Sequence, residues 1–173
     1  PRPGLDAFLI RCREFYDLAV WTSATADYAA CVLAAFLADV PLVFVWSRER
    51  CTRRVDHETR EPYWIKNLEK VRRLGHDLAR VLAIDDLPRT YERNHGNLVR
   101  VSPFTGDPDD DELAPLATYL ESLAAVPDVR RLEKRGWRDR MAALADSGGG
   151  DGGGRDGGGR DDDGREGAPG GTF

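Results

Sequence analysis

The sequence predicts an α/β fold of the three-layer, Rossmann-like type, in which helices cover both faces of a mostly parallel sheet. Three observations predict this class. Short apolar runs that favour strands alternate with patterns that favour helices, as in successive strand–helix–strand units. The runs are apolar throughout, as in strands that are buried on both faces. The chain has 173 residues, 41% of them hydrophobic, which is enough for one domain with its own core.

The first part of the chain contains two helix–strand units. A helix is expected over 3–16, because apolar residues recur at helical spacing and Pro3 suits the first turn. The run "DLAVWTS" at 17–23 is short and apolar and ends in hydroxyls, so we expect a strand. A strongly apolar helix at 26–39 and a second buried strand at 41–47 follow.

The middle of the chain is expected to hold shorter elements. The polar stretch 48–64 is interpreted as a loop or a small hairpin. A short helix over 65–75 is expected to stop at its final glycine. Two further strands are expected at 80–86 and 96–104, and the first of them ends in two adjacent aspartates.

The C-terminal part ends in a segment of different composition. An acidic loop runs into an amphipathic helix within 107–126, where aspartates suit the positive end of the helix dipole, and a last helix follows Pro127. We expect one domain over 1–145. Residues 146–173 are rich in glycine, aspartate and arginine and have almost nothing to bury, so a disordered tail or a tether for a partner is expected.

Charge and composition argue against several classes of protein. The formal net charge is −5, and acids interrupt the densest basic stretch, 131–140, which reads as a solvated helix face. A nucleic-acid surface is therefore not expected. No apolar run approaches the roughly 18 residues of a membrane helix, and no signal peptide is visible. Three cysteines at wide spacing predict structural thiols in a reducing compartment, so we expect a soluble, cytoplasmic protein: Cys12, Cys31 and Cys51.

Polar and charged residues follow the expected strands. In open α/β sheets, ligands bind beyond the carboxyl ends of the strands, so these residues are expected to share one pocket. The first strand ends in two hydroxyls, the second is followed by an arginine, the third ends in two carboxylates, and a lysine opens the helix between the second and third. In chain order they are Thr22, Ser23, Arg48, Lys66, Asp85 and Asp86.

This set of residues points to phosphoryl chemistry. A pair of carboxylates suits Mg²⁺, which keeps several waters and often bridges to phosphate. Lysine, arginine and a hydroxyl suit phosphoryl oxygens, and phosphoryl transfer needs mainly positioning and charge neutralisation. Each residue also has a structural alternative: Thr22 as a helix cap, Lys66 as a solvated lysine, and the Asp85–Asp86 pair as a turn with an Asx cap.

Several ordered segments resemble one known family. The segments at 2–29, 47–51, 64–91 and 106–138 are similar, in the same order, to the haloacid-dehalogenase-like (HAD-like) phosphatase domain of the NLI-interacting-factor family. That family includes RNA polymerase II C-terminal-domain phosphatases and the mitochondrial import translocase subunit. The resemblance implies a HAD-like fold.

The resemblance assigns phosphate-binding roles on one side of the site. Thr22 matches the hydroxyl that binds the transferring phosphoryl group, with Ser23 as second choice. Arg48 matches an arginine that contacts substrate phosphate in some relatives. Tyr28 lies where relatives line a substrate pocket, although a core aromatic is an equal alternative.

On the other side, the resemblance assigns charge neutralisation. Lys66 matches the catalytic lysine, and Asp85 and Asp86 match the acidic motif that holds Mg²⁺. Two departures bear on Lys66. Asn67 stands where the family usually has aspartate, and Lys70 is a weak rival for the lysine role.

The family's first motif has no match in this sequence. That motif is a strand ending in Asp-x-Asp, whose first aspartate is the nucleophile and whose second is the general acid, and it normally precedes the segment that begins at Arg2. Asp6 and Asp17 cannot replace it, because Asp6 falls inside a helix and Asp17 precedes a strand. We therefore expect an N-terminally truncated domain, a sheet that lacks a central strand, and no turnover by the 173-residue chain.

The resemblance implies a Mg²⁺-dependent phosphatase of the aspartyl-phosphate type, acting on phosphoproteins or small phosphomonoesters, with phospho-Ser/Thr proteins as the first guess. The alternative is a catalytically inactive, phosphatase-like binding module, as in the import translocase subunit. A phospho-receiver domain is disfavoured, because its acidic pair comes first along the chain and its lysine last. Here Thr22 and Lys66 precede Asp85 and Asp86. No nucleic-acid or membrane partner is expected.

Overall fold

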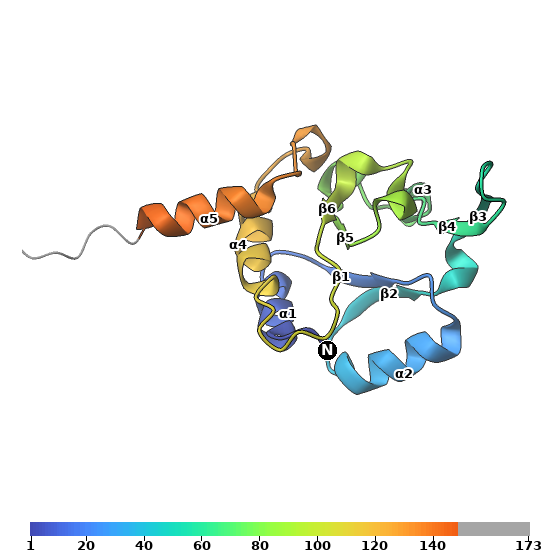
Figure 1. The fold of residues 1–173 in the computed structure, drawn as a ribbon, viewed down its shortest axis with the longest axis horizontal. Coiled ribbons are helices and arrows are strands. Elements are labelled where there is room, and N and C mark those ends of the chain that lie inside the picture. The colour runs from blue at the N-terminus through green and yellow to red at the C-terminus, as the bar shows by residue number, and fades with distance from the viewer. Residues whose placement is uncertain (149–173) are drawn as a thin grey trace, which may run out of the picture.

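The structure is a computed structural model, and it describes residues 1–148 (Figure 1). The part of the expected tail beyond Gly148 lies outside the described residues. The helices are α1 (Leu5–Arg13), α2 (Ala26–Phe36), α3 (Glu69–Arg72), α4 (Leu113–Leu123) and α5 (Trp137–Gly148). The strands are β1 (Leu18–Trp21), β2 (Leu42–Trp46), β3 (Thr52–Val55), β4 (Pro62–Ile65), β5 (Ala83–Asp85) and β6 (Leu98–Arg100).

The strands pair two by two. β1 and β2 are parallel, β5 and β6 are parallel, and β3 and β4 form an antiparallel hairpin. The expected α/β class and its parallel pairing are confirmed, and the polar stretch 48–64 contains the hairpin. Among residues 1–148, however, the two parallel pairs are not hydrogen-bonded to each other and form separate sheets.

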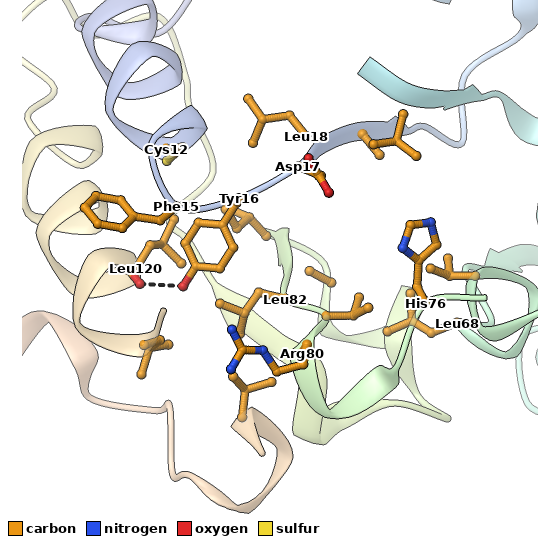
Figure 2. Close-up of a pocket in the computed structure, with 18 of the residues that line it drawn as sticks. Cys12, Phe15, Tyr16, Asp17, Leu18, Leu68, His76, Arg80, Leu82 and Leu120 are labelled. Carbon is orange, nitrogen blue, oxygen red and sulfur yellow. Dashed lines mark hydrogen bonds between the residues drawn. The ribbon is translucent and has the colours of Figure 1, made fainter. Parts of the chain in front are cut away.

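A slot separates β1 from β5. Its volume is about 430 Å³, and residues of β1, β2 and β5 line it together with residues of α1 and α4. Figure 2 shows Leu18 of β1 and Leu82, which precedes β5, on opposite sides of the slot. The Tyr16 hydroxyl lies beside it and donates a hydrogen bond to the carbonyl of Leu120 (2.6 Å).

Both strands turn unpaired backbone groups toward this slot. The N–H of Thr22 donates to Trp46 O of β2 (2.8 Å), and the carbonyl of Asp85 accepts from the N–H of Val101, which follows β6 (3.1 Å). In a parallel strand, neighbouring residues direct their backbone groups to opposite sides. The backbone groups of Trp21 and Ile84 therefore face away from these partners, and both residues line the slot.

The strands around the slot expose apolar side chains that a parallel sheet normally buries. Val43 of β2 is 50% exposed and Ile84 of β5 is 40% exposed, and both line the slot. Parallel sheets occur almost only with both faces covered. These side chains therefore remain open to solvent at the slot.

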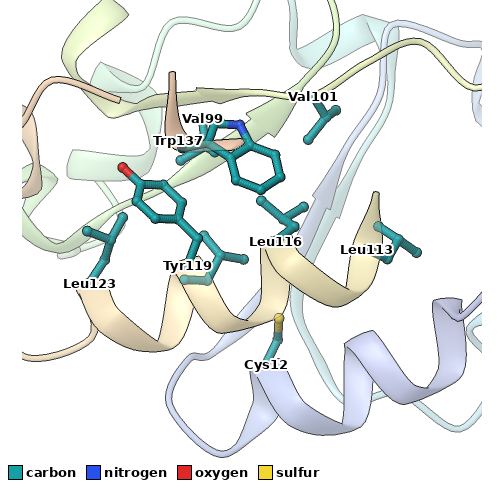
Figure 3. Packing of buried hydrophobic residues seen from close by; sticks show 9 residues of the cluster. Cys12, Val99, Val101, Leu113, Leu116, Tyr119, Leu123 and Trp137 are labelled. Atoms are coloured by element: carbon teal, nitrogen blue, oxygen red, sulfur yellow. The ribbon is translucent and has the colours of Figure 1, made fainter. Parts of the chain in front are cut away.

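Two apolar clusters hold the described residues together. The larger joins α1, β6, α4 and α5 (Figure 3), and its buried members are Cys12, Val99, Val101, Leu113, Leu116, Tyr119, Leu120, Leu123 and Trp137. The smaller packs α3 and its flanks against β2, β5 and β6, and its buried members are Trp46, Leu68, Val71, Leu78, Ala83, Tyr91 and Leu98. None of the helices in residues 1–148 combines the length and apolar character of a membrane span.

Tertiary bonds shorten the helix expected over 65–75. Lys66 directly follows β4, and its N–H donates to Thr90 O (2.7 Å), while the N–H of Leu68 donates to Asn94 Oδ1 (3.0 Å). Ile65 is paired with Thr52 at the end of β4, so the chain is still extended there and the α-helix begins only at Glu69. Lys66 therefore stands after a strand rather than at the start of a helix.

We expect Leu116→Ala to destabilise the fold by about 2–5 kcal/mol, because Leu116 is 0% exposed at the centre of the larger cluster and its loss leaves a cavity. Urea unfolding followed by tryptophan fluorescence measures the change. Leu144→Ala is the matched control: Leu144 is 62% exposed on α5, so a change within about 0.5 kcal/mol is expected. Equal losses in the two variants would contradict this description of the core.

Candidate active site

Thr22 and Ser23 form a turn directly after β1. The Thr22 hydroxyl oxygen accepts a hydrogen bond from the N–H of Ala24 (3.0 Å), which fixes the side chain beside the turn. This bond uses the oxygen as an acceptor and leaves the hydroxyl proton free to donate. Both residues are half-buried. The structural alternative for Thr22, a helix cap, is not what the structure shows, because the N-cap of α2 is Thr25 and the bond of Thr22 belongs to the turn before it.

Arg48 lies beside the same turn. Its N–H donates to Ala24 O (2.9 Å), and its Nε donates to Ser23 O (2.6 Å). Its guanidinium carbon lies 4.9 Å from the ring centroid of Trp64 on β4, a cation–π contact with the hairpin. The arginine is exposed, so guanidinium N–H groups remain at the surface near Thr22 and Ser23.

Lys66 and Asp85 form a buried ion pair across the elements. The Lys66 Nζ–Asp85 Oδ2 distance is 2.6 Å, and each side chain is 9% exposed. Asp85 Oδ1 also accepts from the N–H of Leu87 (2.9 Å). Removing either partner would leave the other charge buried without compensation, which is destabilising. Lys66, and not its rival Lys70, therefore meets the acidic pair; Lys70 donates to Arg50 O instead (2.6 Å).

Asp86 has different surroundings from Asp85. Asp85 is engaged with Lys66, whereas the charge of Asp86 acts on Arg2. The pKa of Arg2 is raised mainly by its hydrogen bonds to the Asp110 carboxylate (2.7 Å each) and further by nearby charges that include Asp86. Asp85 thus has a direct cationic partner, whereas Asp86 acts on Arg2 only through its charge, because the direct partner of Arg2 is Asp110.

Cys51 and Tyr91 connect the two sides of the site. The Cys51 thiol donates to Thr22 O (3.7 Å), and its pKa is raised by burial, an effect that the charge of Lys66 opposes. Lys66 Nζ lies 5.6 Å from the ring centroid of Tyr91. Burial, and then the charge of Asp85, raise the pKa of Tyr91, so its hydroxyl stays protonated. The residues that flank the hairpin, Cys51 and Lys66, therefore contact the carboxyl end of β1 and that of β5, respectively.

Sequence reasoning missed these two connecting residues. Cys51 was expected to be only a structural thiol, and Tyr91 lies in a stretch without a recognisable pattern. Their roles come from contacts with segments distant along the chain, which local spacing does not reveal. Tyr28, the candidate pocket residue, is 65% exposed on α2, and Asn67 Oδ1 accepts the N–H of Glu69 (3.1 Å) at the start of α3.

The carboxylates suit a divalent metal only as part of a ligand set. Carboxylate oxygens are the hard ligands that Mg²⁺ prefers. Within the described 1–148, no group of three or more His, Cys, Asp and Glu side chains could hold a metal ion. Asp85 and Asp86 therefore fit as two ligands of an ion that takes the others from water, substrate phosphate or a further carboxylate. Both Asp85 oxygens already accept hydrogen bonds, so its metal contact would compete with Lys66 and Leu87.

The chain was compared with known proteins and solved structures. It is 34% identical over 131 residues to the human carboxy-terminal domain RNA polymerase II polypeptide A small phosphatase 1, covering 74% of this chain and 46% of that protein. It is 30% identical to the mitochondrial import inner membrane translocase subunit TIM50 of Phytophthora infestans, covering 76% of this chain and 30% of that protein. The structure of the fission yeast RNA polymerase II CTD phosphatase Fcp1 aligns with a TM-score of 0.47 at 20% identity, over 84% of this chain and 48% of that chain.

The chain spans less than half the length of these curated relatives. The family model for NLI interacting factor-like phosphatase matches residues 1–130, which is most of the chain. By this match, the chain belongs to the NLI interacting factor-like phosphatase family.

Proposed function

We propose that this chain forms the phosphate-binding and charge-neutralising side of a Mg²⁺-dependent phosphatase of the aspartyl-phosphate type. The substrates are phosphomonoesters, with phospho-Ser/Thr proteins as the first class. The observation that carries the proposal is the buried Lys66–Asp85 pair at the end of the slot where β1 delivers the Thr22 hydroxyl. An ammonium, a hydroxyl and carboxylates around one opening suit a transferring phosphoryl group.

Each residue on the phosphate side has a distinct role in this proposal. Lys66 neutralises charge on the phosphoryl oxygens and on the attacking carboxylate. The Thr22 hydroxyl donates to a phosphoryl oxygen, and Ser23 adds a second donor from the same turn. Arg48, anchored on Ser23 O, offers its remaining N–H groups to substrate phosphate at the surface.

The nucleophile in this proposal arrives on an additional strand. The unpaired backbone edges of β1 and β5 line one slot, and Cys51 and Lys66 contact their carboxyl ends. A strand placed there in parallel would complete the hydrogen bonding of both and cover Val43 and Ile84. The residue that follows it would then lie between Thr22 and Lys66, where the family's Asp-x-Asp motif would bring its carboxylate.

Hydrolysis of the phosphomonoester then takes two steps. The carboxylate oxygen attacks phosphorus, the ester P–O bond breaks, and the leaving alkoxide takes a proton from the second aspartate of that motif. Water hydrolyses the acyl phosphate and releases inorganic phosphate and the carboxylate. Mg²⁺ held by Asp85 and Asp86 would neutralise negative charge on the phosphoryl oxygens.

A phosphatase-like binding module is the second candidate. Similarity to a TIM50 translocase subunit favours it, because that relative is named for transport and not for hydrolysis. The buried Lys66–Asp85 pair favours the enzyme, since a binding surface does not need two charges out of water. All three cysteines are free thiols, which supports the proposal that either function is exercised inside the cell.

We expect no Mg²⁺-dependent hydrolysis of an aryl phosphate by the 173-residue chain, and activity when the chain is extended by a strand that carries the family's Asp-x-Asp motif. The physical reason is that the proposed mechanism needs an attacking carboxylate, which Asp6 and Asp17 cannot supply from their places in the sequence. Colorimetric assay of both proteins, with and without Mg²⁺, provides the measurement.

Asp86→Ala in the extended protein tests the metal assignment. Activity is expected to fall by about 10²-fold or more, with a weaker dependence on Mg²⁺ concentration. Asp139→Ala, which removes a carboxylate from α5, is the matched control and should leave the activity and its dependence on Mg²⁺ unchanged. Unaltered activity and metal dependence in Asp86→Ala would show that the metal assignment is wrong.

We expect Lys66→Met to destabilise the chain by about 3–5 kcal/mol, because it leaves the Asp85 carboxylate buried without its partner. The double variant Lys66→Met/Asp85→Asn should recover part of that loss, since it removes both charges. Urea unfolding of the single and double variants gives the coupling between the two residues. Lys70→Met, which loses only a hydrogen bond to a backbone carbonyl, should cost no more than about 1.5 kcal/mol.

A further inference from the structure

A second cavity adjoins the candidate active site and is strongly basic. Its volume is about 970 Å³, and it is lined by the segment 130–138, by residues of β6 and by Pro88. We call it the basic groove. Its lining holds a single carboxylate and these cationic side chains: Arg100, Arg130, Arg131, Lys134, Arg135 and Arg138. Some of these cations have carboxylate partners just outside the lining: Arg130 and Arg131 pair with Asp128, and Arg138 pairs with Glu112.

The wall of the basic groove is fixed by buried contacts. Trp137 is 1% exposed, and its indole N–H donates to Arg100 O on β6 (2.8 Å). The buried Lys134 ammonium donates to the carbonyl of Leu132 (3.0 Å) and to that of Val129. These bonds fold the segment back over β6. Residues 131–140 were expected to form a solvated helix face, but part of this stretch lines the basic groove.

The basic groove opens next to the phosphoryl site. Arg100 is the register partner of Asp85 in the β5–β6 pair, so the two backbones lie about 5 Å apart and their side chains leave the sheet on the same face. Pro88, which also lines the groove, follows Asp85 by three positions. A peptide whose phosphorylated residue sits at Asp85 can thus place its neighbouring residues in the groove.

Two arginines of the groove are available to a ligand. The side chains of Arg131 and Arg135 are 86% and 90% exposed, and their ion pairs with Asp128 (3.5 Å) and Glu133 (2.7 Å) are surface pairs. Such pairs contribute little to stability, so a ligand carboxylate can replace them at small cost. Arg138 differs, because its partner Glu112 is almost buried and holds it in place.

We propose that the basic groove binds an acidic peptide segment, so that the favoured substrates are phosphoproteins with aspartate and glutamate beside the phosphorylated residue. The substrate preference rests on the proposed function, whereas the binding of an acidic peptide to the groove does not. Guanidinium groups pair with carboxylates in a bidentate geometry that suits such a segment. Trp137 is buried, which leaves the ring of His95 as the exposed aromatic of the lining, and carboxylates interrupt the basic stretch, so a peptide fits better than a nucleic acid.

The test measures binding of labelled peptides to the 173-residue chain by fluorescence anisotropy. The probes are a short peptide with serine flanked by aspartates and glutamates, its phosphoserine form, and both forms with lysine flanks. We expect the acidic unphosphorylated peptide to bind, and Arg131→Glu/Arg135→Glu to weaken it about tenfold or more. Arg13→Glu/Arg53→Glu, which reverses two exposed arginines outside the groove, is the matched control and should change the affinity about twofold at most.

The variants separate this proposal from the proposed function. Lys66→Met should remove the gain in affinity that phosphorylation of the acidic peptide brings; an unaffected gain counts against the phosphoryl site alone. Equal losses in the two double-arginine variants, or equal binding of lysine-flanked peptides, would overturn the groove proposal. It is also overturned if single-stranded oligonucleotides or anionic lipid vesicles bind more tightly with the same sensitivity to Arg131→Glu/Arg135→Glu. Circular dichroism confirms that each variant is folded.

Discussion

The unsatisfied backbone edges of β1 and β5 are the constraint on which the rest of the described structure depends. Each strand is hydrogen-bonded on one side only, so the two parallel pairs form separate sheets, and side-chain packing, as of β2 against β5 and β6, joins them instead. The slot between them keeps apolar strand residues in contact with solvent. A strand edge with free backbone groups is a template for another strand. The unpaired edges of β1 and β5 thus weaken the fold, and they could pair with a further strand.

The polar site lies just beyond the ends of β1 and β5, where side chains bond to the chain. Beyond the last residues of β1 and β5, side chains make the contacts: Cys51 contacts the backbone of Thr22, and Lys66 bonds Asp85. These bonds connect the segments around the two sheets through the hairpin side of the molecule. Burying the ion pair is costly unless both charges are matched closely. These side-chain bonds therefore hold the charged residues of the site in place although the sheet is not continuous.

The sequence predicted the parts of the structure that depend on local pattern. Apolar runs placed β1, β2 and β5, and the rule that ligands bind at strand ends led to Thr22, Lys66 and Asp85. The predictions were less accurate where distant partners decide the outcome. Lys66 was expected to open a helix, but the carbonyl of Thr90 takes its N–H, and Tyr91 and the wall around Trp137 are defined by contacts far apart along the chain. No spacing rule contains that information.

The adjacent aspartates at the end of β5 show how one short stretch serves two surroundings. Asp85 is held by Lys66 on one side, while the charge of Asp86 acts on Arg2. The direct partner of Arg2 is Asp110, so the direct ion pair of the two aspartates is that of Asp85 with Lys66. Across the sheet, Arg100 is the register partner of Asp85 and lines the basic groove. Lys66 and Arg100 therefore place positive charge beside Asp85, an arrangement that suits a substrate carrying a phosphate and further negative charge beside it.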